Sequence, residues 1–106
     1  MKDVEVKVGL RVTYNGSVIE WADGTKLKQG KYVVTYVNEN RNLVKIKADR
    51  KNAVTSYTLY LNTFKPKQLE WDDVTNLLQV HFFTSRETWI VTDEELIKKA
   101  RKYNRR

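Results

Sequence analysis

Short runs of alternating apolar and polar residues, separated by tight-turn signals, constrain the fold of this chain most. Valine, leucine and tyrosine occupy every second position from Val4 to Tyr14. The residues that lie between them are charged or polar, apart from Gly9. Successive side chains of a strand point to opposite faces, so a two-residue period is the pattern of a half-buried strand. The sequence therefore predicts a strand over 4–14 and a mainly β fold.

Asn15-Gly16 follows this strand and is a strong signal for a hairpin. These are the residue types that a type I′ turn needs, because both of its central residues have positive φ. A two-residue loop would set Val12 opposite Ile19 on one face and Arg11 opposite Glu20 on the other. Apolar residues and opposite charges would then meet across the pair. We expect a hairpin in this register.

Further strand patterns and turn signals follow at short intervals. Asp23-Gly24 predicts a turn, and the lysine-rich segment up to Gly30 fits a loop or a short irregular strand. Both faces of the next strand favour β structure, which predicts that it is covered on both sides. The polar clusters 38–42 and 49–52 predict turns. The expected strands cover 31–37, 43–48 and 54–61.

The last third of the chain predicts both helix and strand. Asp72 is a candidate N-cap for one or two helical turns over 72–78. A strand over 80–84 and a turn over 85–87 would lead to a second strand over 89–91 that pairs back. Thr92 and Glu95 form a capping box, followed by an apolar stripe that predicts a helix packed on the β structure. The stripe consists of Leu96, Ile97, Ala100 and Tyr103.

Length and composition predict one soluble domain in a reducing compartment. A chain of 106 residues is long enough to close one core without disulfides, and it contains no cysteine. Residues 1–5 carry no apolar signal segment, and no stretch approaches the length of a membrane span. We expect a cytoplasmic protein with a single domain over 1–106.

Residues 8–68 resemble the SH3-like small barrel, the superfold of KOW and Tudor domains. The resemblance is carried by the strand Arg11-Val12-Thr13-Tyr14, by Leu27-Lys28-Gln29-Gly30-Lys31-Tyr32-Val33-Val34, and by Leu61-Asn62-Thr63-Phe64-Lys65-Pro66. The pattern Leu-x-x-Gly-Lys-x-Val is similar to the start of the second strand in many small phage SH3-like proteins. Neither the KOW glycine pattern nor the Tudor aromatic cage is evident.

Together with the predicted C-terminal helix, which lies outside the resemblance, these features predict a mainly β fold with a C-terminal α-helix. Its core would be an SH3-like small antiparallel barrel over 8–68. Residues 69–106 would add an extension with a short helix, a strand pair and a basic C-terminal helix. Such barrels imply binding to nucleic acid or protein, by analogy of fold alone.

The net charge of +7 is distributed unevenly along the chain. Residues 26–51 carry eight Lys or Arg against two Asp or Glu, and residues 98–106 carry six basic residues and no acid. Residues 64–97, in contrast, carry three basic residues against seven acids. A polarised charge distribution predicts a defined contact face rather than general adhesion.

The two basic segments contain the candidate binding residues. Lys45 and Lys47 share one strand face, and most of the other basic residues of 26–51 lie in or beside adjoining loops. Cations neutralise phosphates, and neighbouring tyrosines provide surfaces on which bases stack. The alternative is a solvated face whose lysines aid solubility. The nucleic-acid-binding candidates are Lys26, Lys28, Lys31, Lys45, Lys47, Arg50, Lys51, Lys98, Lys99, Arg101, Lys102, Arg105 and Arg106, with Tyr32, Tyr36, Tyr57 and Tyr60 as stacking candidates.

Catalytic and metal chemistry find little support in the sequence. His81 is the only histidine, which excludes paired imidazoles, and no serine is flanked by the glycines of a nucleophile elbow. Glu70, Asp72 and Asp73 could act as an acid and base or hold a divalent metal, but capping a short helix is the preferred interpretation. We expect no catalytic residues, no metal site, no cofactor and no enzymatic activity.

The leading hypothesis is a non-enzymatic nucleic-acid-binding protein that contacts DNA or RNA phosphates through residues 26–51 and the C-terminal helix. The alternative is a small phage or mobile-element protein that binds and modulates a host protein, such as a polymerase, nuclease or defence complex, in the host cytoplasm. Trp21, Trp71 and Trp89 are large enough to anchor such a protein interface. No membrane partner is expected, because the apolar stripe of the basic helix is narrow.

Overall fold

The computed structural model describes residues 2–68, 70–71, 88–91 and 94–104. The elements in this part of the chain are β1 (Lys2–Asp3), β2 (Arg11–Tyr14), β3 (Ile19–Glu20), β4 (Lys26–Leu27), β5 (Gly30–Asn38), β6 (Leu43–Ala48), β7 (Ser56–Tyr60), β8 (Lys67–Gln68), β9 (Trp89–Val91) and α2 (Glu94–Asn104).

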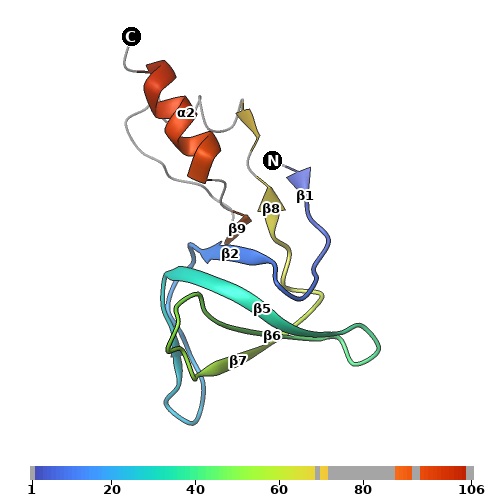
Figure 1. Cartoon of the computed structure of the whole chain (residues 1–106). Coiled ribbons are helices and arrows are strands. Elements are labelled where there is room, and N and C mark those ends of the chain that lie inside the picture. Colours follow the sequence, from blue (N-terminus) through green and yellow to red (C-terminus); the bar gives the residue numbers. More distant parts are fainter. Residues whose placement is uncertain (1, 69, 72–87, 92–93, 105–106) are drawn as a thin grey trace.

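The described strands form one large sheet and one small one. Seven of them pair in the order β1-β8-β9-β2-β5-β6-β7, and β3 pairs with β4 separately. Figure 1 shows the large sheet curling round on itself below α2, with β6 and β7 at the far end. The prediction of a mainly β fold is confirmed.

Strands β5, β6 and β7 form an antiparallel meander that follows the predicted pattern closely. Val44 and Ile46 are fully buried, whereas Lys45 and Lys47 between them are exposed. Val44 lies opposite Val37 on β5 and Leu59 on β7, so apolar side chains meet on the inner face. The alternation over 43–48 therefore predicted both the strand and the face that it buries.

The expectation that the strand beginning near Lys31 is covered on both sides is wrong. Tyr32 and Val34 are buried, but Lys31, Thr35 and Tyr36 are exposed. The high β propensity of both faces reflects the fit of branched and aromatic side chains to a pleated backbone, which does not require a second covering layer.

The strand predicted over 4–14 is much shorter in the structure. Strand β2 begins at Arg11, and Val8 and Gly9 form a turn in which Gly9 has a φ of 93°. This left-handed backbone conformation interrupts an extended chain and is readily adopted by glycine. Val8 is consequently 64% exposed despite its place in the apolar alternation.

The hairpin predicted at Asn15-Gly16 is also wrong. Strand β2 pairs with β5 and β9, while β3 pairs with β4. Neither Asn15 nor Gly16 has the positive φ of a type I′ turn. Gly16 instead allows a close approach, because a Cβ there would lie 2.6 Å from the Tyr14 hydroxyl oxygen. The Tyr14 hydroxyl donates a hydrogen bond to the Ser17 carbonyl, which closes this loop.

The turn predicted at Asp23-Gly24 is confirmed and connects β3 to the short β4. Gly24 has a φ of 89°, and its amide donates to the Trp21 carbonyl at 3.0 Å. The Thr25 amide donates to the Asp23 carboxylate at 2.9 Å. This hydrogen bond lowers the pKa of Asp23 from its ordinary value.

One aromatic-rich core connects the two halves of the chain. Trp89 is 5% exposed, and its ring centre lies 4.6 Å from that of Tyr14 and 4.8 Å from that of Phe64. A strand over 89–91 is confirmed as β9, but its neighbours in the sheet are β2, antiparallel, and β8, parallel, and not the preceding segment onto which it was expected to pair back. Trp89, which lies in the segment 69–106 predicted as an extension, therefore packs in the same core as residues 8–68. The buried apolar residues of this core are Val12, Tyr14, Leu27, Tyr32, Val34, Val44, Ile46, Phe64 and Trp89.

Several predictions for the C-terminal third lie outside the described residues. These are the helical turns over 72–78, the strand over 80–84, the turn over 85–87 and the cap at Thr92. Within the part of the chain that the structure describes, no helix is long and apolar enough to cross a membrane.

Candidate nucleic-acid interface

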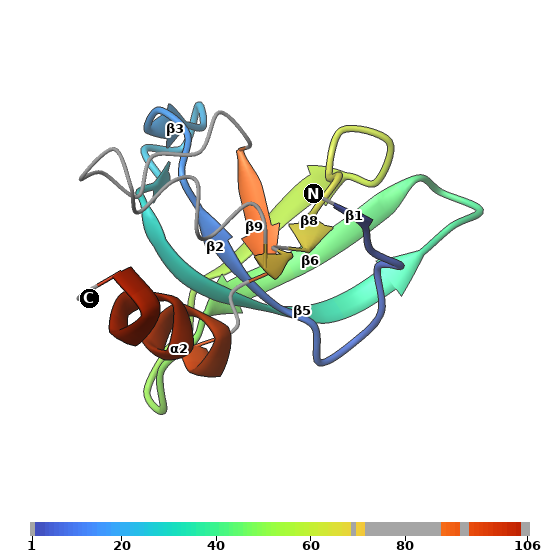
Figure 2. The same cartoon turned by 90° about the horizontal axis from the view of Figure 1, so that it is seen from above.

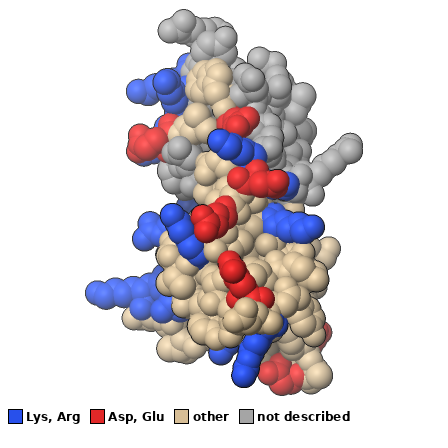
Figure 3. All heavy atoms as spheres, turned by 90° about the vertical axis from the view of Figure 1, so that its right-hand side faces the viewer, with Lys and Arg blue, Asp and Glu red and all other residues tan. Residues whose placement is uncertain are grey.

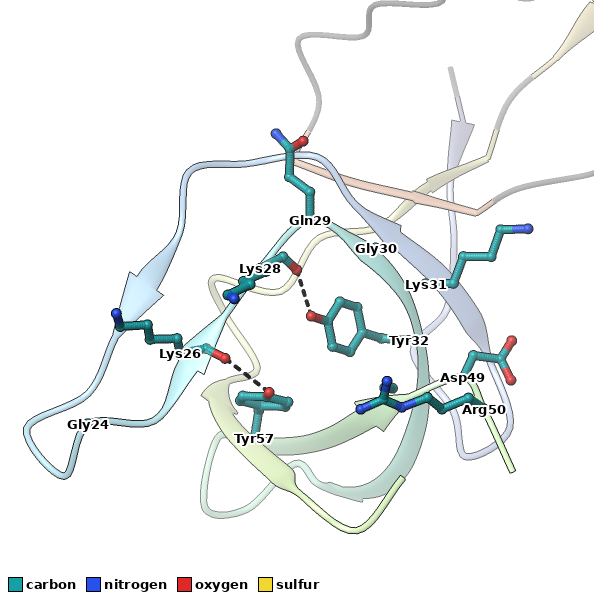
Figure 4. Close-up of a pocket in the computed structure, with 11 residues that line it drawn as sticks. Gly24, Lys26, Lys28, Gln29, Gly30, Lys31, Tyr32, Asp49, Arg50 and Tyr57 are labelled. Atoms are coloured by element: carbon teal, nitrogen blue, oxygen red, sulfur yellow. Dashed lines mark hydrogen bonds between the residues drawn. The ribbon is translucent and has the colours of Figure 1, made fainter. Parts of the chain in front are cut away.

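A hollow of about 620 Å³ opens at one end of the curled sheet, between the β3–β4 hairpin and the ends of β5 and β6. Figure 4 shows it surrounded by residues that are distant in sequence. Its lining consists of Gly24, Lys26, Lys28, Gln29, Gly30, Lys31, Tyr32, Ala48, Asp49, Arg50 and Tyr57. We call this hollow the mouth.

Hydrogen bonds from Tyr57 and Tyr32 hold the lysine-rich wall of the mouth in place. The Tyr57 hydroxyl donates to the Lys26 carbonyl at 3.0 Å, and the Tyr32 hydroxyl donates to the Lys28 carbonyl at 2.6 Å. The Gln29 side-chain amide also donates to the carbonyl of Gly16 at 3.2 Å. The backbone of 26–29 is therefore fixed by hydrogen bonds, while its lysine side chains extend into solvent.

The charge of the mouth is strongly positive. Four of its lining residues are cations, namely Lys26, Lys28, Lys31 and Arg50, and Asp49 is the only acid among the described lining residues. The Arg11 guanidinium lies 3.5 Å from the Asp49 carboxylate and partly balances that charge. In Figure 4 Arg50 lies beside the Tyr32 and Tyr57 rings, whereas Lys31 points away from them.

A second group of candidates lies on the outer face of the β5–β6–β7 meander. Lys45 and Lys47 alternate with buried residues of β6, so both side chains leave the sheet on this face. Lys31 and Tyr36 of β5 are exposed, as is Tyr60 of β7. Tyr36 faces outward because a β-bulge between Val34 and Tyr36 shifts the register by one residue.

The four tyrosines predicted to stack on bases divide into two kinds. Tyr32 is only 6% exposed, and burial raises its pKa. Tyr57 is half-buried, with its ring centre 5.8 Å from that of Tyr32 and 5.7 Å from that of Trp21. Tyr32 therefore offers little ring surface for stacking, whereas Tyr57 is partly accessible in the wall of the mouth, and its predicted stacking role stays a prediction. Tyr36 and Tyr60 are 42% and 65% exposed.

The remaining basic candidates lie elsewhere. Lys51 is exposed in the turn after β6. Lys98, Lys99, Arg101 and Lys102 are exposed on α2, which stands above β2 and β9 in Figure 1 and contributes none of the described lining of the mouth. The ammonium of Lys99 lies 5.7 Å from the centre of the Trp71 ring. Arg105 and Arg106 lie outside the described residues.

Arg11 is a basic residue of this region that the sequence did not indicate. The expected hairpin placed it opposite Glu20, but it pairs with Val33 of β5, which in turn pairs with Lys47 of β6. Its side chain is 77% exposed. The partner of β2 is remote in the chain, so no local pattern could have placed Arg11 in the same row as Lys47.

Basic residues do not cover the molecule uniformly. Figure 2 shows β1 and β8 beside each other, and Figure 3 shows the side of the molecule on which they lie. Acidic and basic side chains are interspersed on that side. Lys67 of β8, for example, forms an ion pair with Asp3 of β1. The mouth and the outer face differ from it in their excess of cations.

His81, Asp72 and Asp73 lie outside the described residues, so the structure does not place them. Within the described residues, no group of three or more His, Asp or Glu side chains could hold a metal ion. The chemistry that the site itself offers is attraction of anions by lysine and arginine. Comparison with known proteins finds no family model, no curated protein and no solved structure that matches this chain.

Proposed function

We propose that this protein is a non-enzymatic nucleic-acid-binding module that contacts backbone phosphates through the mouth. The observation that carries the proposal is the gathering of Lys26, Lys28 and Arg50 around one hollow, with Lys31 at its edge. Asp49 is the only acid in the described lining, and Arg11 partly balances its charge. Neutralising phosphates releases counterions and supplies most of the affinity of sequence-independent binding.

The types of cation around the mouth favour a phosphate backbone over a specific base. Lysine acts as a flexible point charge, in contrast to the rigid fork of arginine that reads guanine. Three of the four cations are lysines. Contacts to phosphates fix the position of a protein on a strand but carry no sequence information. We therefore expect binding with limited sequence selectivity.

The test is fluorescence anisotropy with labelled DNA and RNA across a salt series. The variant Lys26→Gln/Lys28→Gln/Arg50→Gln removes three charges from the mouth. The control variant, Lys2→Gln/Lys7→Gln/Lys65→Gln, removes the same charge from exposed residues on or beside β1 and β8. Both variants have the same net charge, so a difference between them reports position.

Each lost phosphate contact lowers the slope of log affinity against log salt by about 0.7–0.9. We expect the slope of log affinity against log salt to decrease in magnitude by about two to three in the mouth variant and by less than about one in the control variant. Equal losses in both variants would refute the mouth as the contact site. Wild-type binding that is insensitive to salt would refute phosphate contact altogether.

The finer description of the fold belongs to the same proposal. We propose that residues 8–68 form an SH3-like barrel, to which C-terminal strands and the basic helix are added. The curl of β2, β5, β6 and β7 around one core supports the barrel. The exposed cations of α2 support a contribution of the helix to phosphate binding. The variant Lys98→Gln/Arg101→Gln/Lys102→Gln tests that contribution, because it would reduce the salt slope if the helix contacts phosphates.

A second candidate function is binding of a host protein. Val18 and Ile19, at the β3–β4 hairpin, are 57% and 39% exposed, and Trp71 is 36% exposed. A large exposed aromatic side chain such as Trp71 is a typical anchor of a protein interface, and exposed apolar residues such as Val18 and Ile19 can extend an apolar contact surface. A pull-down from nuclease-treated bacterial lysate distinguishes the two functions, since a protein partner would remain and a nucleic-acid bridge would be lost. Trp89 is buried and is not available as an anchor.

A further inference from the structure

The strand register brings cations and tyrosines into neighbouring rows on the outer face of the sheet. Arg11, Val33, Lys47 and Ser56 lie side by side on four successive strands. The next row contains Tyr36, Lys45 and Thr58, and the one after it contains Asn38, Leu43 and Tyr60. The described strand residues of this face include no acid. Asp49, which follows the end of β6, forms an ion pair with Arg11.

Tyr36 and Tyr60 are the aromatic residues of this face, and both are open to solvent at 42% and 65% exposure. The Asn38 side-chain amide donates to the Tyr36 hydroxyl at 2.9 Å, and this bond helps to orient the ring. The ammonium of Lys45 lies 5.4 Å from the Tyr36 ring centre, within the range of a cation–π contact. Tyr60 lies on β7, the edge strand of the large sheet.

We propose that this face binds single-stranded nucleic acid, with Tyr36 and Tyr60 stacking on bases while Lys45 and Lys47 neutralise phosphates. The inference rests on the proposed function and adds the class of nucleic acid and the residues that contact its bases. An open aromatic ring beside cations provides the two interactions that hold a single strand, namely stacking and phosphate neutralisation.

The geometry of the two tyrosines favours a single strand over a duplex. They lie two strands apart across the sheet and two residues apart along it, a separation of roughly 12 Å between backbones. Bases of an ordered helix stack at about 3.4 Å, so these rings reach bases that are splayed apart. The bases of a duplex are already stacked, and separating them costs a few kcal/mol per step.

The test compares three ligands of equal length by fluorescence anisotropy: oligothymidine, an abasic strand with the same phosphates, and a duplex. The variant Tyr36→Ala/Tyr60→Ala removes both rings, and Tyr36→Phe/Tyr60→Phe keeps the stacking surfaces as a matched control. Both side chains are exposed, so we expect each variant to fold, which circular dichroism checks. If the double alanine variant does not fold, Tyr60→Ala alone replaces it.

We expect wild-type protein to bind oligothymidine more tightly than the abasic strand or the duplex. Each alanine substitution should weaken oligothymidine binding by at least about fivefold and leave abasic binding unchanged. The phenylalanine variant should keep most of the wild-type affinity, because it retains both rings and loses only the hydrogen bond from Asn38 to Tyr36. The salt slope should stay the same in all of them, because the number of phosphate contacts does not change.

Two results would overturn the inference while leaving the proposed function intact. In the first, the alanine variant binds oligothymidine as tightly as wild type does, whereas the mouth variant Lys26→Gln/Lys28→Gln/Arg50→Gln binds it more weakly. The other is an equal loss for the oligothymidine and abasic strands, since tyrosines that contact bases cannot affect a strand without bases. Wild-type protein that binds none of the three ligands at low salt would refute the proposed function itself.

Discussion

Replacing Trp89 with alanine is expected to destabilise the fold by about 3–5 kcal/mol. Trp89 belongs to β9, twenty-one residues beyond the last residue of β8, and it is 5% exposed. Its ring centre lies 4.6 Å from that of Tyr14, 4.8 Å from that of Phe64 and 6.3 Å from that of Tyr32. The substitution would therefore leave a cavity among three aromatic rings of the core.

The expected magnitude follows from the area that the side chain buries. A buried aromatic side chain removes roughly 150–250 Å² from water, which corresponds to about 4–6 kcal/mol as an upper bound. Alanine keeps one side-chain carbon, and partial collapse of the cavity reduces the cost further. A domain of this size is stable by about 5–15 kcal/mol, so the loss is a large fraction of the total.

Urea unfolding, monitored by far-ultraviolet circular dichroism, measures the change in the free energy of unfolding. Circular dichroism is used because the substitution removes a tryptophan and so alters the fluorescence signal itself. Thermal unfolding should show a midpoint lower by roughly 15–30 °C. Trp71→Ala is the matched control, because Trp71 is 36% exposed and should cost clearly less than Trp89→Ala. A loss below about 1 kcal/mol for Trp89→Ala, or equal losses for both variants, would refute the inclusion of β9 in the core.

Three further changes have defined outcomes. Gly16→Ala should lower the urea midpoint by the equivalent of about 1–3 kcal/mol, since its Cβ would lie 2.6 Å from the Tyr14 hydroxyl oxygen; an unchanged midpoint would contradict this close approach. A hydrogen bond from Lys67 holds the pKa of Asp3 below its usual 3.8, so the pair stabilises the fold above about pH 4 and loses this effect as pH falls through the lower folded pKa. Asp3→Asn should reduce the loss of stability between pH 5 and pH 2 in urea unfolding by a small amount, because the pair is exposed. Burial raises the pKa of Tyr14 and Tyr32 above 10, so their contribution to stability is complete below pH 10 and is lost as pH rises through the folded pKa. Ultraviolet titration should show tyrosines that ionise late, and Tyr32→Phe should remove one of them.

The sequence predicted the β5–β6–β7 meander well because the interactions that form it are local. Each strand pairs with the next along the chain, and polar turn residues mark where the chain reverses. The alternation of Val44 and Ile46 with Lys45 and Lys47 fixed the buried face of β6 before any partner was known. The concentration of charge in residues 26–51 likewise predicted the cations that the mouth and the outer face contain.

Pairings between distant segments could not be predicted in this way. Thr13 pairs with Ile90 and Val12 pairs with Tyr32, and no local pattern specifies which remote strand is the partner. The hairpin predicted from Asn15-Gly16 was wrong because a glycine can be required at a position for either of two physical reasons. It permits positive φ, and it also permits close approach, which is its purpose beside Tyr14.

Tyr36 shows most clearly what the sequence determined and what tertiary structure decided. Tyr32, Val34 and Tyr36 share one phase of the alternation, so the sequence predicted a strand and placed all three on the same face. The bulge between Val34 and Tyr36 adds one residue to β5, and a shift of one residue sends the following side chains to the opposite face. Tyr32 therefore packs in the core while Tyr36 faces solvent beside Lys45. Local periodicity determined the strands, but the pairing of β5 with β6 decided which tyrosines are exposed to solvent.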